Sequence, residues 1–202
     1  MQFPRTFLPE LTTATFNLQS EGGNSGAPFR NDFIEIFNGG SATVSLAGWS
    51  YAGATGMSWS VTDLTPVSLA PGQYYLIQES SGGSAGANLP TPDVTGTTGM
   101  AAAASKVALV NSSSALSGAC PTDATIVDLV GYGNSANCFR GVGPTAATSN
   151  ATGILRKNNG RTETSNNAGD FAAGPPNPRN RNAAISPLRQ RCDFTNTFIS
   201  LS

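Results

Sequence analysis

Short runs in which apolar and polar residues alternate, separated by turns rich in glycine and proline, recur along the chain. In the run DFIEIFN, residues 32–38, Ile34 and Ile36 fall on one face of a strand, and Phe33, Glu35 and Phe37 on the other. This alternation is typical of a β-strand, whereas an amphipathic helix needs a period near 3.6 residues. Many short strands with turns between them predict an all-β sandwich or barrel and not a series of βαβ units.

The alternating pattern predicts strands at residues 13–20, 32–38, 42–50, 58–64, 72–79, 105–111 and 124–133, with a shorter strand and turn at 153–160. Gly39 and Gly40 are predicted to form the two-residue turn of a hairpin between the second and third of these strands. Residues 80–105 carry a single charge and are expected to form a loop or a weak edge. Residues 169–180 are predicted to be an extended, proline-rich ending.

The composition agrees with a turn-rich β protein. Charged residues make up 11% of the chain, against about 25% in a typical soluble protein. The formal net charge is −1, so no overall field would attract nucleic acid or an anionic membrane. The basic residues are unevenly spread, however, because seven of the eleven lie between residues 156 and 191 beside only two acidic ones.

The chain contains no histidine, which excludes several kinds of catalytic site. Ser-His-Asp and Cys-His machinery cannot be built, and the imidazole that most often ligates metals is missing. Carboxylates, lysine or a bare thiol are the remaining options. No run of 18 apolar residues is present, so no membrane span is expected.

Several landmarks together resemble the lamin tail domain in its bacterial extracellular branch. In order along the chain they are NDFIEIFNGGSATVSLAGWS, LAPGQYYLIQ, KVALVN, CPTDATIVDLVGYGNSANCF and SNATGILRKNNGRTETSNNAGDF with PPNPRN. The resemblance covers roughly residues 15–180 and implies an immunoglobulin-like β-sandwich on a secreted or cell-surface protein. Such modules often lie beside nuclease or phosphoesterase domains, but the resemblance implies no catalytic residues.

The expected organisation is therefore an all-β, immunoglobulin-like β-sandwich with extended arms at both ends. Residues 1–13 are expected to form an N-terminal arm and residues 14–180 the lamin-tail-like β-sandwich. Residues 181–202 are expected to form a basic linker and a strand-like C-terminal arm, because the sequence alternates again from residue 192 onward.

Cys120 and Cys138 flank a predicted strand and its return. They could be two buried thiols or a disulfide, and both the composition and the resemblance to a secreted family favour the disulfide. Without a nearby third thiolate or imidazole the two are not a zinc site. Cys192 is left over and could pair between molecules or stay a free thiol.

The acidic residues do not suggest a catalytic pair. Asp32 and Glu35 are three apart on a strand and are expected to point to opposite faces. Glu35 is interpreted as a structural hydrogen-bond acceptor at a sheet rim. Asp123 and Asp128 flank an apolar run and are expected to face solvent. We therefore assign no catalytic or cofactor-binding residue.

An oxygen-rich segment at residues 163–170 is the best, though weak, candidate for a metal site. It contains Glu163, Asn166, Asn167 and Asp170. Calcium takes six to eight oxygen ligands, and this segment supplies two carboxylates where relatives often carry an acidic run. Capping of turns by the asparagine side chains is the preferred interpretation, so no metal or other cofactor is expected.

The aromatic residues are interpreted as framework and not as a sugar-stacking site. Trp49 ends a predicted strand at the position of the family's core tryptophan, and the alternation around Trp59 also suggests burial. Tyr74 and Tyr75 are neighbours on a strand, so one of them is expected to be exposed.

Both arms are too apolar for free tails. The apolar residues are Phe3, Phe7, Leu8 and Leu11 at one end and Phe194, Phe198, Ile199 and Leu201 at the other. Exposed alternating apolar segments favour pairing with another sheet edge, so self-association is expected. The arms could instead fold back on their own domain.

The leading functional hypothesis is a non-catalytic extracellular structural or interaction protein that forms an oligomer or filament. The alternative is a binding or targeting module associated with a secreted nuclease or phosphoesterase. A carboxylate-based hydrolase is the weakest hypothesis. A set of arginines late in the chain could contact an anionic polymer or simply belong to a solvated linker: Arg179, Arg181, Arg189 and Arg191.

Overall fold

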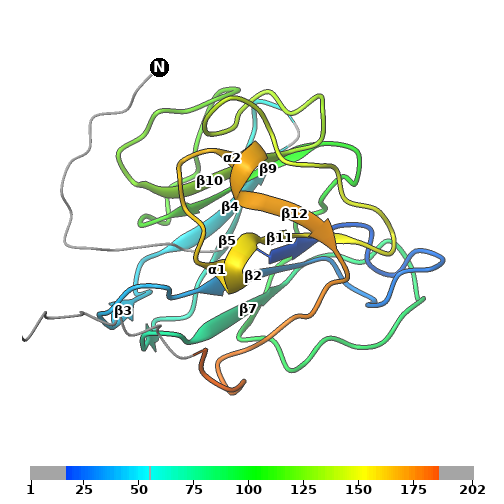
Figure 1. The fold of residues 1–202 in the computed structure, drawn as a ribbon, viewed down its shortest axis with the longest axis horizontal. Coiled ribbons are helices and arrows are strands. Elements are labelled where there is room, and N and C mark those ends of the chain that lie inside the picture. Colours follow the sequence, from blue (N-terminus) through cyan, green and yellow to red (C-terminus); the bar gives the residue numbers. More distant parts are fainter. Residues whose placement is uncertain (1–16, 55, 187–202) are drawn as a thin grey trace, which may run out of the picture.

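The computed structural model describes residues 17–186 apart from residue 55. Within this range the chain is a β-sandwich, as predicted, and its elements are almost all strands (Figure 1). Residues 13–16 of the first predicted strand and the whole predicted strand at 192–202 lie outside the described residues, as do all eight apolar arm residues, Cys192, Arg189 and Arg191. No helix among the described residues is long and apolar enough to cross a membrane.

One sheet has six strands in the order β12-β11-β1-β2-β7-β8. All neighbours in it are antiparallel except β7 and β8, which run parallel. Its strands are β1 (Asn17–Gln19), β2 (Phe33–Phe37), β7 (Tyr74–Gln78), β8 (Val94–Thr95), β11 (Gly153–Arg156) and β12 (Phe171–Gly174). Two single-turn helices, α1 (Lys157–Gly160) and α2 (Asn167–Asp170), connect β11 to β12.

The second sheet has four antiparallel strands in the order β10-β9-β4-β5. They are β4 (Ser50–Ala54), β5 (Ser60–Asp63), β9 (Ser105–Val110) and β10 (Ile126–Tyr132). A separate two-stranded ribbon joins β3 (Val44–Ser45) to β6 (Ser68–Leu69). Strands from both large sheets meet in one core, which includes Ile34, Ile36 and Ile77 from the first and Val107 and Leu109 from the second.

The predicted hairpin at Gly39–Gly40 is wrong. Strand β2 pairs with β1 and β7, while β3 pairs with β6. The Asn38 side chain accounts for the departure, because its Nδ2 donates to the carbonyl oxygens of Ala42 and Leu69 and its Oδ1 accepts from the Gly40 N–H. The glycine pair therefore lies in a crossover that leaves the six-stranded sheet.

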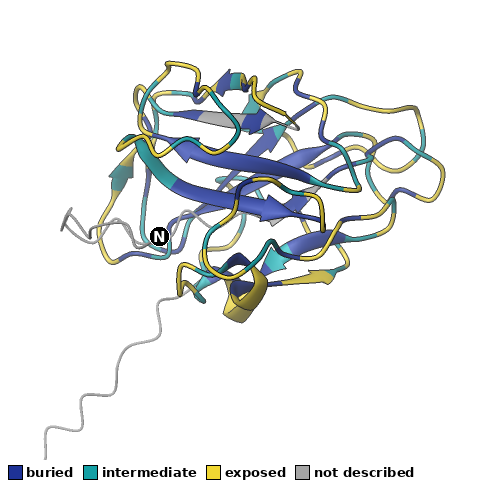
Figure 2. Cartoon of the chain, turned by 90° about the horizontal axis from the view of Figure 1, so that it is seen from above, coloured by how far each residue is buried: buried dark blue, intermediate teal, exposed yellow. Residues whose placement is uncertain are grey.

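In a simple β-sandwich the outer faces of the two sheets are exposed to solvent. Here loops pack on both outer faces. On the six-stranded sheet, Phe33 and Leu76 pack with Leu89 from the long loop after β7. On the four-stranded sheet, Trp59 and Leu129 lie in a second outer cluster that includes Cys138. Figure 2 shows the resulting run of buried residues along the central strands. Tyr74 and Tyr75 are accordingly both buried, so the expectation that one is exposed is wrong.

The predicted disulfide between Cys120 and Cys138 is confirmed. It clips two long loops together over the outer face of the four-stranded sheet. Gly131 in β10 makes room for this cover, since a Cβ atom there would lie 2.1 Å from the Cys138 carbonyl oxygen.

Candidate functional site

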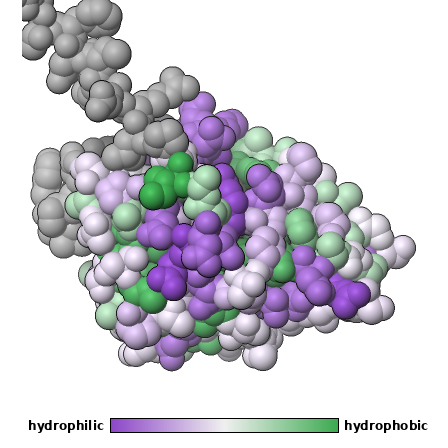
Figure 3. Space-filling model, turned by 90° about the horizontal axis from the view of Figure 1, so that it is seen from below, coloured by the Kyte–Doolittle hydropathy of each residue, from purple (hydrophilic) through white to green (hydrophobic). Residues whose placement is uncertain are grey.

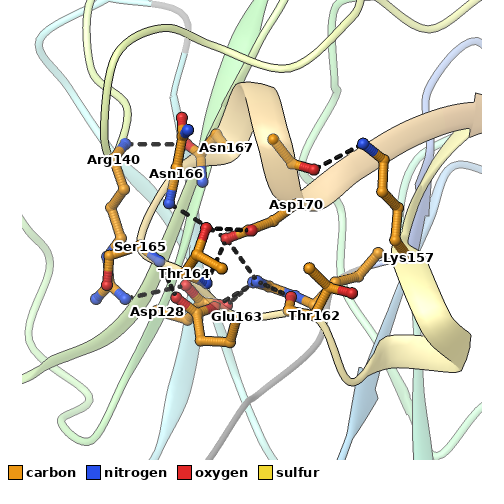
Figure 4. A network of polar contacts seen from close by, with 12 residues as sticks. Asp128, Arg140, Lys157, Thr162, Glu163, Thr164, Ser165, Asn166, Asn167 and Asp170 are labelled. Carbon is orange, nitrogen blue, oxygen red and sulfur yellow. Dashed lines mark hydrogen bonds and ion pairs between the residues drawn. The ribbon is translucent and has the colours of Figure 1, made fainter.

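The largest group of charged side chains surrounds Arg156, at the end of β11. We call it the Arg156 cluster, and Figure 4 shows most of its members. Arg156 is only 3% exposed. Its Nη2 lies 2.6 Å from Asp128 Oδ2, while its Nη1 is paired with Glu163 and lies 3.7 Å from Asp170 Oδ2. Arg140 adds a second guanidinium, with Nη1 3.4 Å from Asp128 Oδ1.

Asp128 was expected to face solvent, and this is wrong: it is buried among these arginines. Of its two apolar neighbours in sequence, Val127 packs against the main core and Leu129 lies in the outer cluster, while the segment that follows the start of β11 covers Asp128 with Arg156. Asp123 is exposed, as expected. Burial raises the pKa of the Glu163 carboxyl, and the neighbouring Asp128 raises it further.

The weak metal candidates lie in or beside this cluster, but hydrogen-bond donors already face their oxygens. The Thr164 N–H donates to Asp170 Oδ2 at 2.9 Å, and the Thr164 hydroxyl donates to Oδ1 at 2.6 Å. Glu163 faces the Arg156 guanidinium. In the described part of the chain, no group of three or more acidic, cysteine or histidine side chains is arranged to hold a metal ion.

Asn167 reaches from α2 to the outer edge of β10. Its Oδ1 accepts the N–H groups of Gly131 at 2.9 Å and Arg140 at 3.0 Å, and its Nδ2 donates to the Leu129 carbonyl oxygen at 3.2 Å. The side chain is therefore bonded to β10 as a neighbouring strand would be. Turn capping was the preferred interpretation for this side chain, but its partners are instead the backbone of β10 and of Arg140.

The rest of that edge is closed in the same way. Arg140 Nη2 donates to the Val127 carbonyl oxygen, and Asp128 Oδ1 accepts from the Leu129 N–H. Thr145 bonds to Gly131 and Gly133 through its backbone. The outward hydrogen-bonding groups of β10 from the Val127 carbonyl to the Gly133 N–H thus all have partners. An edge protected like this cannot accept another strand without losing these bonds.

Glu35 forms the second buried ion pair. It lies in β2, in the middle of the six-stranded sheet and not at its rim as predicted, and it is fully buried. Arg179 binds it at two points, with Nη2 2.7 Å from Oε1 and Nε 3.0 Å from Oε2, and also lies over the Tyr74 ring. The prediction that Glu35 is a structural acceptor is correct.

Arg181 makes a weaker pair with Asp93, with Nε 3.1 Å from Oδ1. Ser186 continues the contacts, because its N–H donates to the Gly72 carbonyl oxygen. The segment after β12 therefore stays on the sandwich beyond residue 180. Two of the four arginines considered for an anionic polymer already bind carboxylates of their own chain.

Asp32 lies just before β2, and its carboxylate binds backbone N–H groups, whereas Glu35 binds Arg179. Asp32 Oδ1 accepts from the Gly22 N–H at 2.8 Å and Oδ2 from the Met100 N–H at 3.1 Å. Burial raises its pKa to about 6. It borders an open hollow of about 310 Å³ together with Glu21, Asn24 and Ser80.

Lys106 is the most buried amine, at 1% exposure, and sequence reasoning did not single it out. Its Nζ donates to Gly56 O and Asn137 Oδ1, both at 2.6 Å, and to Ala119 O, and it lies 5.1 Å from the centroid of the Trp59 ring. Burial lowers the pKa of the ammonium. Because three oxygens receive its three hydrogens, it ties loops together and is not placed as a nucleophile.

The tryptophans are framework, as predicted. Trp59 is buried, and its Nε1 donates to the Gly118 carbonyl oxygen at 3.0 Å. Trp49 is half-buried and packs against the main core.

Comparison with known proteins supplies the remaining observations. The family described as Lamin Tail Domain matches residues 13–134, which is more than half of the chain. No curated protein sequence matches. Among solved structures, a DUF4876 family protein from Bacteroides thetaiotaomicron VPI-5482 is similar, with a TM-score of 0.55 and 14% identity over 87% of this chain and 75% of that one. That likeness extends to the fold alone.

Proposed function

The chain belongs to the lamin tail domain family, and we propose that it is a non-catalytic, extracellular or cell-surface structural protein that self-associates through its terminal arms. The observation that carries the non-catalytic part is how the charged groups are used. The buried carboxylates described above face arginines, hydroxyls or backbone N–H groups of the same chain. General acid–base catalysis needs a carboxylate free to exchange a proton with a substrate, and bonds of this kind instead favour a structural role.

The assignment to an extracellular setting is supported by the disulfide, because disulfides persist in oxidising compartments. Family membership supports a binding or structural module over an enzyme.

Self-association is supported by a contrast between the surface of the described sandwich and the sequence of the arms. The sandwich has few large apolar residues on its surface, namely Met57, Phe139, Val142 and Ile185 among those described. Figure 3 shows apolar and polar residues interspersed on the face it presents. The arms hold eight more, and burying one such side chain contributes about 1.5–3 kcal/mol. Ordering the arms costs about 1–2 kcal/mol per residue, so main-chain hydrogen bonds to the neighbouring molecule must add to the burial of these side chains.

Light scattering over a range of concentrations tests the proposal. The full chain is expected to gain mass with concentration, and deletion of residues 1–12 or 192–202 is expected to reduce that gain. A chain that stays monomeric at every concentration, with deletions that only destabilise it, would show that the arms fold back on their own domain. The alternative of a binding or targeting module would then be preferred.

A further inference from the structure

The two edges of the four-stranded sheet differ. Leu64 N donates to the Trp49 carbonyl oxygen, and Ser50 is opposite Asp63 in the same ladder. Alternate residues of an antiparallel strand bond to the same neighbour, so Val61 and Asp63 direct their N–H and C=O groups away from β4. Among the described residues, no hydrogen-bond partner meets these four groups. In the described part of the chain, the outer edge of β5 is therefore open at Val61 and Asp63, although Met57 just before it accepts a hydrogen bond from the Gly118 N–H.

The edges of the six-stranded sheet are poorer acceptors. Strand β12 runs directly into Pro175 and Pro176, which have no N–H to donate. Strand β8 has two residues and runs parallel to its neighbour. Open β5 is therefore the edge best suited to receive a strand.

The C-terminal arm is the better donor of the two arms. Residues 192–202 contain no proline, whereas Pro4 and Pro9 interrupt the N-terminal arm. Sixteen residues follow Ser186, which would span roughly 50 Å when extended. If residues 192–202 form the added strand, residues 187–191 link it to the sandwich and would span roughly 17 Å when extended.

We propose that the outer edge of β5, at Val61 and Asp63, accepts residues 192–202 of a second copy of the chain as an added strand. This rests on the proposed self-association and specifies where it occurs. Main-chain hydrogen bonds would supply the affinity, and alternating side chains of the donor would set its register. In the donor, Phe194 and Phe198 share one face, while Ile199 and Leu201 share the other.

The first test compares Val61→Pro with Val61→Thr. Proline removes the outward N–H without touching a bond to β4, while threonine keeps it and is a matched control. We expect Val61→Pro to be a folded monomer by circular dichroism and light scattering, and Val61→Thr to assemble like the unchanged chain. Assembly of both variants would overturn the proposed acceptor while leaving self-association intact. Lack of assembly by the unchanged chain would overturn both proposals.

Hydrogen exchange decides the matter if Val61→Pro fails to fold. The Val61 and Asp63 amides are expected to exchange at least about tenfold more slowly in the assembled full chain than in a chain lacking residues 192–202. A synthetic peptide of residues 192–202 should restore the protection to the shortened chain. Unprotected amides in the assembly would overturn the acceptor. Protection in a monomeric full chain would show that the segment binds its own β5 and would overturn the role of a second copy.

Discussion

Arg179 binds Glu35 across 144 positions of sequence, with two nitrogens of one guanidinium on the two oxygens of one carboxylate. The carboxylate lies on the outer face of β2, where the core of a simple sandwich would not extend. This pair holds the segment after β12 against the sheet. It helps to explain why the residues on the outer face of β2 are buried.

Loss of the pair should be costly, because it leaves Glu35 charged and buried. We expect Arg179→Ala to lower the free energy of unfolding by about 3 kcal/mol in a urea titration followed by tryptophan fluorescence. Arg181→Ala is the matched control, since that side chain is 38% exposed and its pair with Asp93 should contribute less than about 1 kcal/mol. Equal losses in the two variants would contradict the special position of Glu35.

The closed edge of β10 depends on Asn167. Replacing it with alanine leaves the Gly131 N–H and the Leu129 carbonyl without the carboxamide, at a cost of about 1–3 kcal/mol. The exposed edge should also increase aggregation on storage, measured by light scattering. Asn166→Ala, which loses only a 3.4 Å bond to the Val142 N–H, should behave like the unchanged chain. A soluble and fully stable Asn167→Ala protein would show that the carboxamide does not protect the edge.

The disulfide closes a loop with a sequence separation of 18 residues. Its loss in the Cys120→Ser, Cys138→Ser double variant should reduce stability by about 3 kcal/mol, because the unfolded chain regains loop entropy. Thermal unfolding of the oxidised, reduced and double-variant proteins measures this. If reduction leaves the midpoint unchanged, the clip over the outer face does not contribute to stability.

Stability should fall as pH rises from about 4 to about 6. Burial raises the pKa of Asp32 to about 6 and also raises that of Glu79. In this window the unfolded carboxyl groups are ionised, while the folded ones still hold protons, so the stabilisation present below pH 4 is lost as pH rises. Because the pKa of Asp32 is raised to about 6 in the folded state, its protonation contributes about 3 kcal/mol to the free energy of unfolding at low pH.

Urea unfolding at pH 4 and pH 7 measures the effect. Asp32→Asn should flatten the pH dependence, while Asp123→Asn should not, since hydrogen bonds from Thr125 lower the pKa of Asp123 below this window. A protein that gains stability between pH 4 and pH 7 would contradict the assignment.

The strands could be predicted because alternation is a local property: β2, β7, β9 and β10 all lie within predicted ranges. Pairing is not local, and this is why the pattern around Gly39–Gly40 suggested a hairpin although β2 and β3 join different partners. The same limit applies to the charged residues. Asp128 looks like a surface residue until Arg156, 28 positions later, is placed beside it.

Tyr74 and Glu35 show the second limit. Alternation tells which face of a strand a side chain occupies, but not whether a distant segment covers that face. Here residues 175–186 cover the outer face of β2 and β7. The sequence had suggested that residues from 181 onward form a linker.

In polymer chemistry, the number of sites through which a monomer can be joined to others is called its functionality. The closed edge of β10 limits this number for the subunit. If chains join only by adding residues 192–202 to β5 of the next molecule, each offers one donor segment and one acceptor edge, so it is a bifunctional monomer. Such monomers form linear chains or rings and cannot branch. Their mean length rises with concentration. It falls when a subunit that lacks residues 192–202 is added, because that subunit ends a chain, so assembly length can be controlled without changing the sandwich.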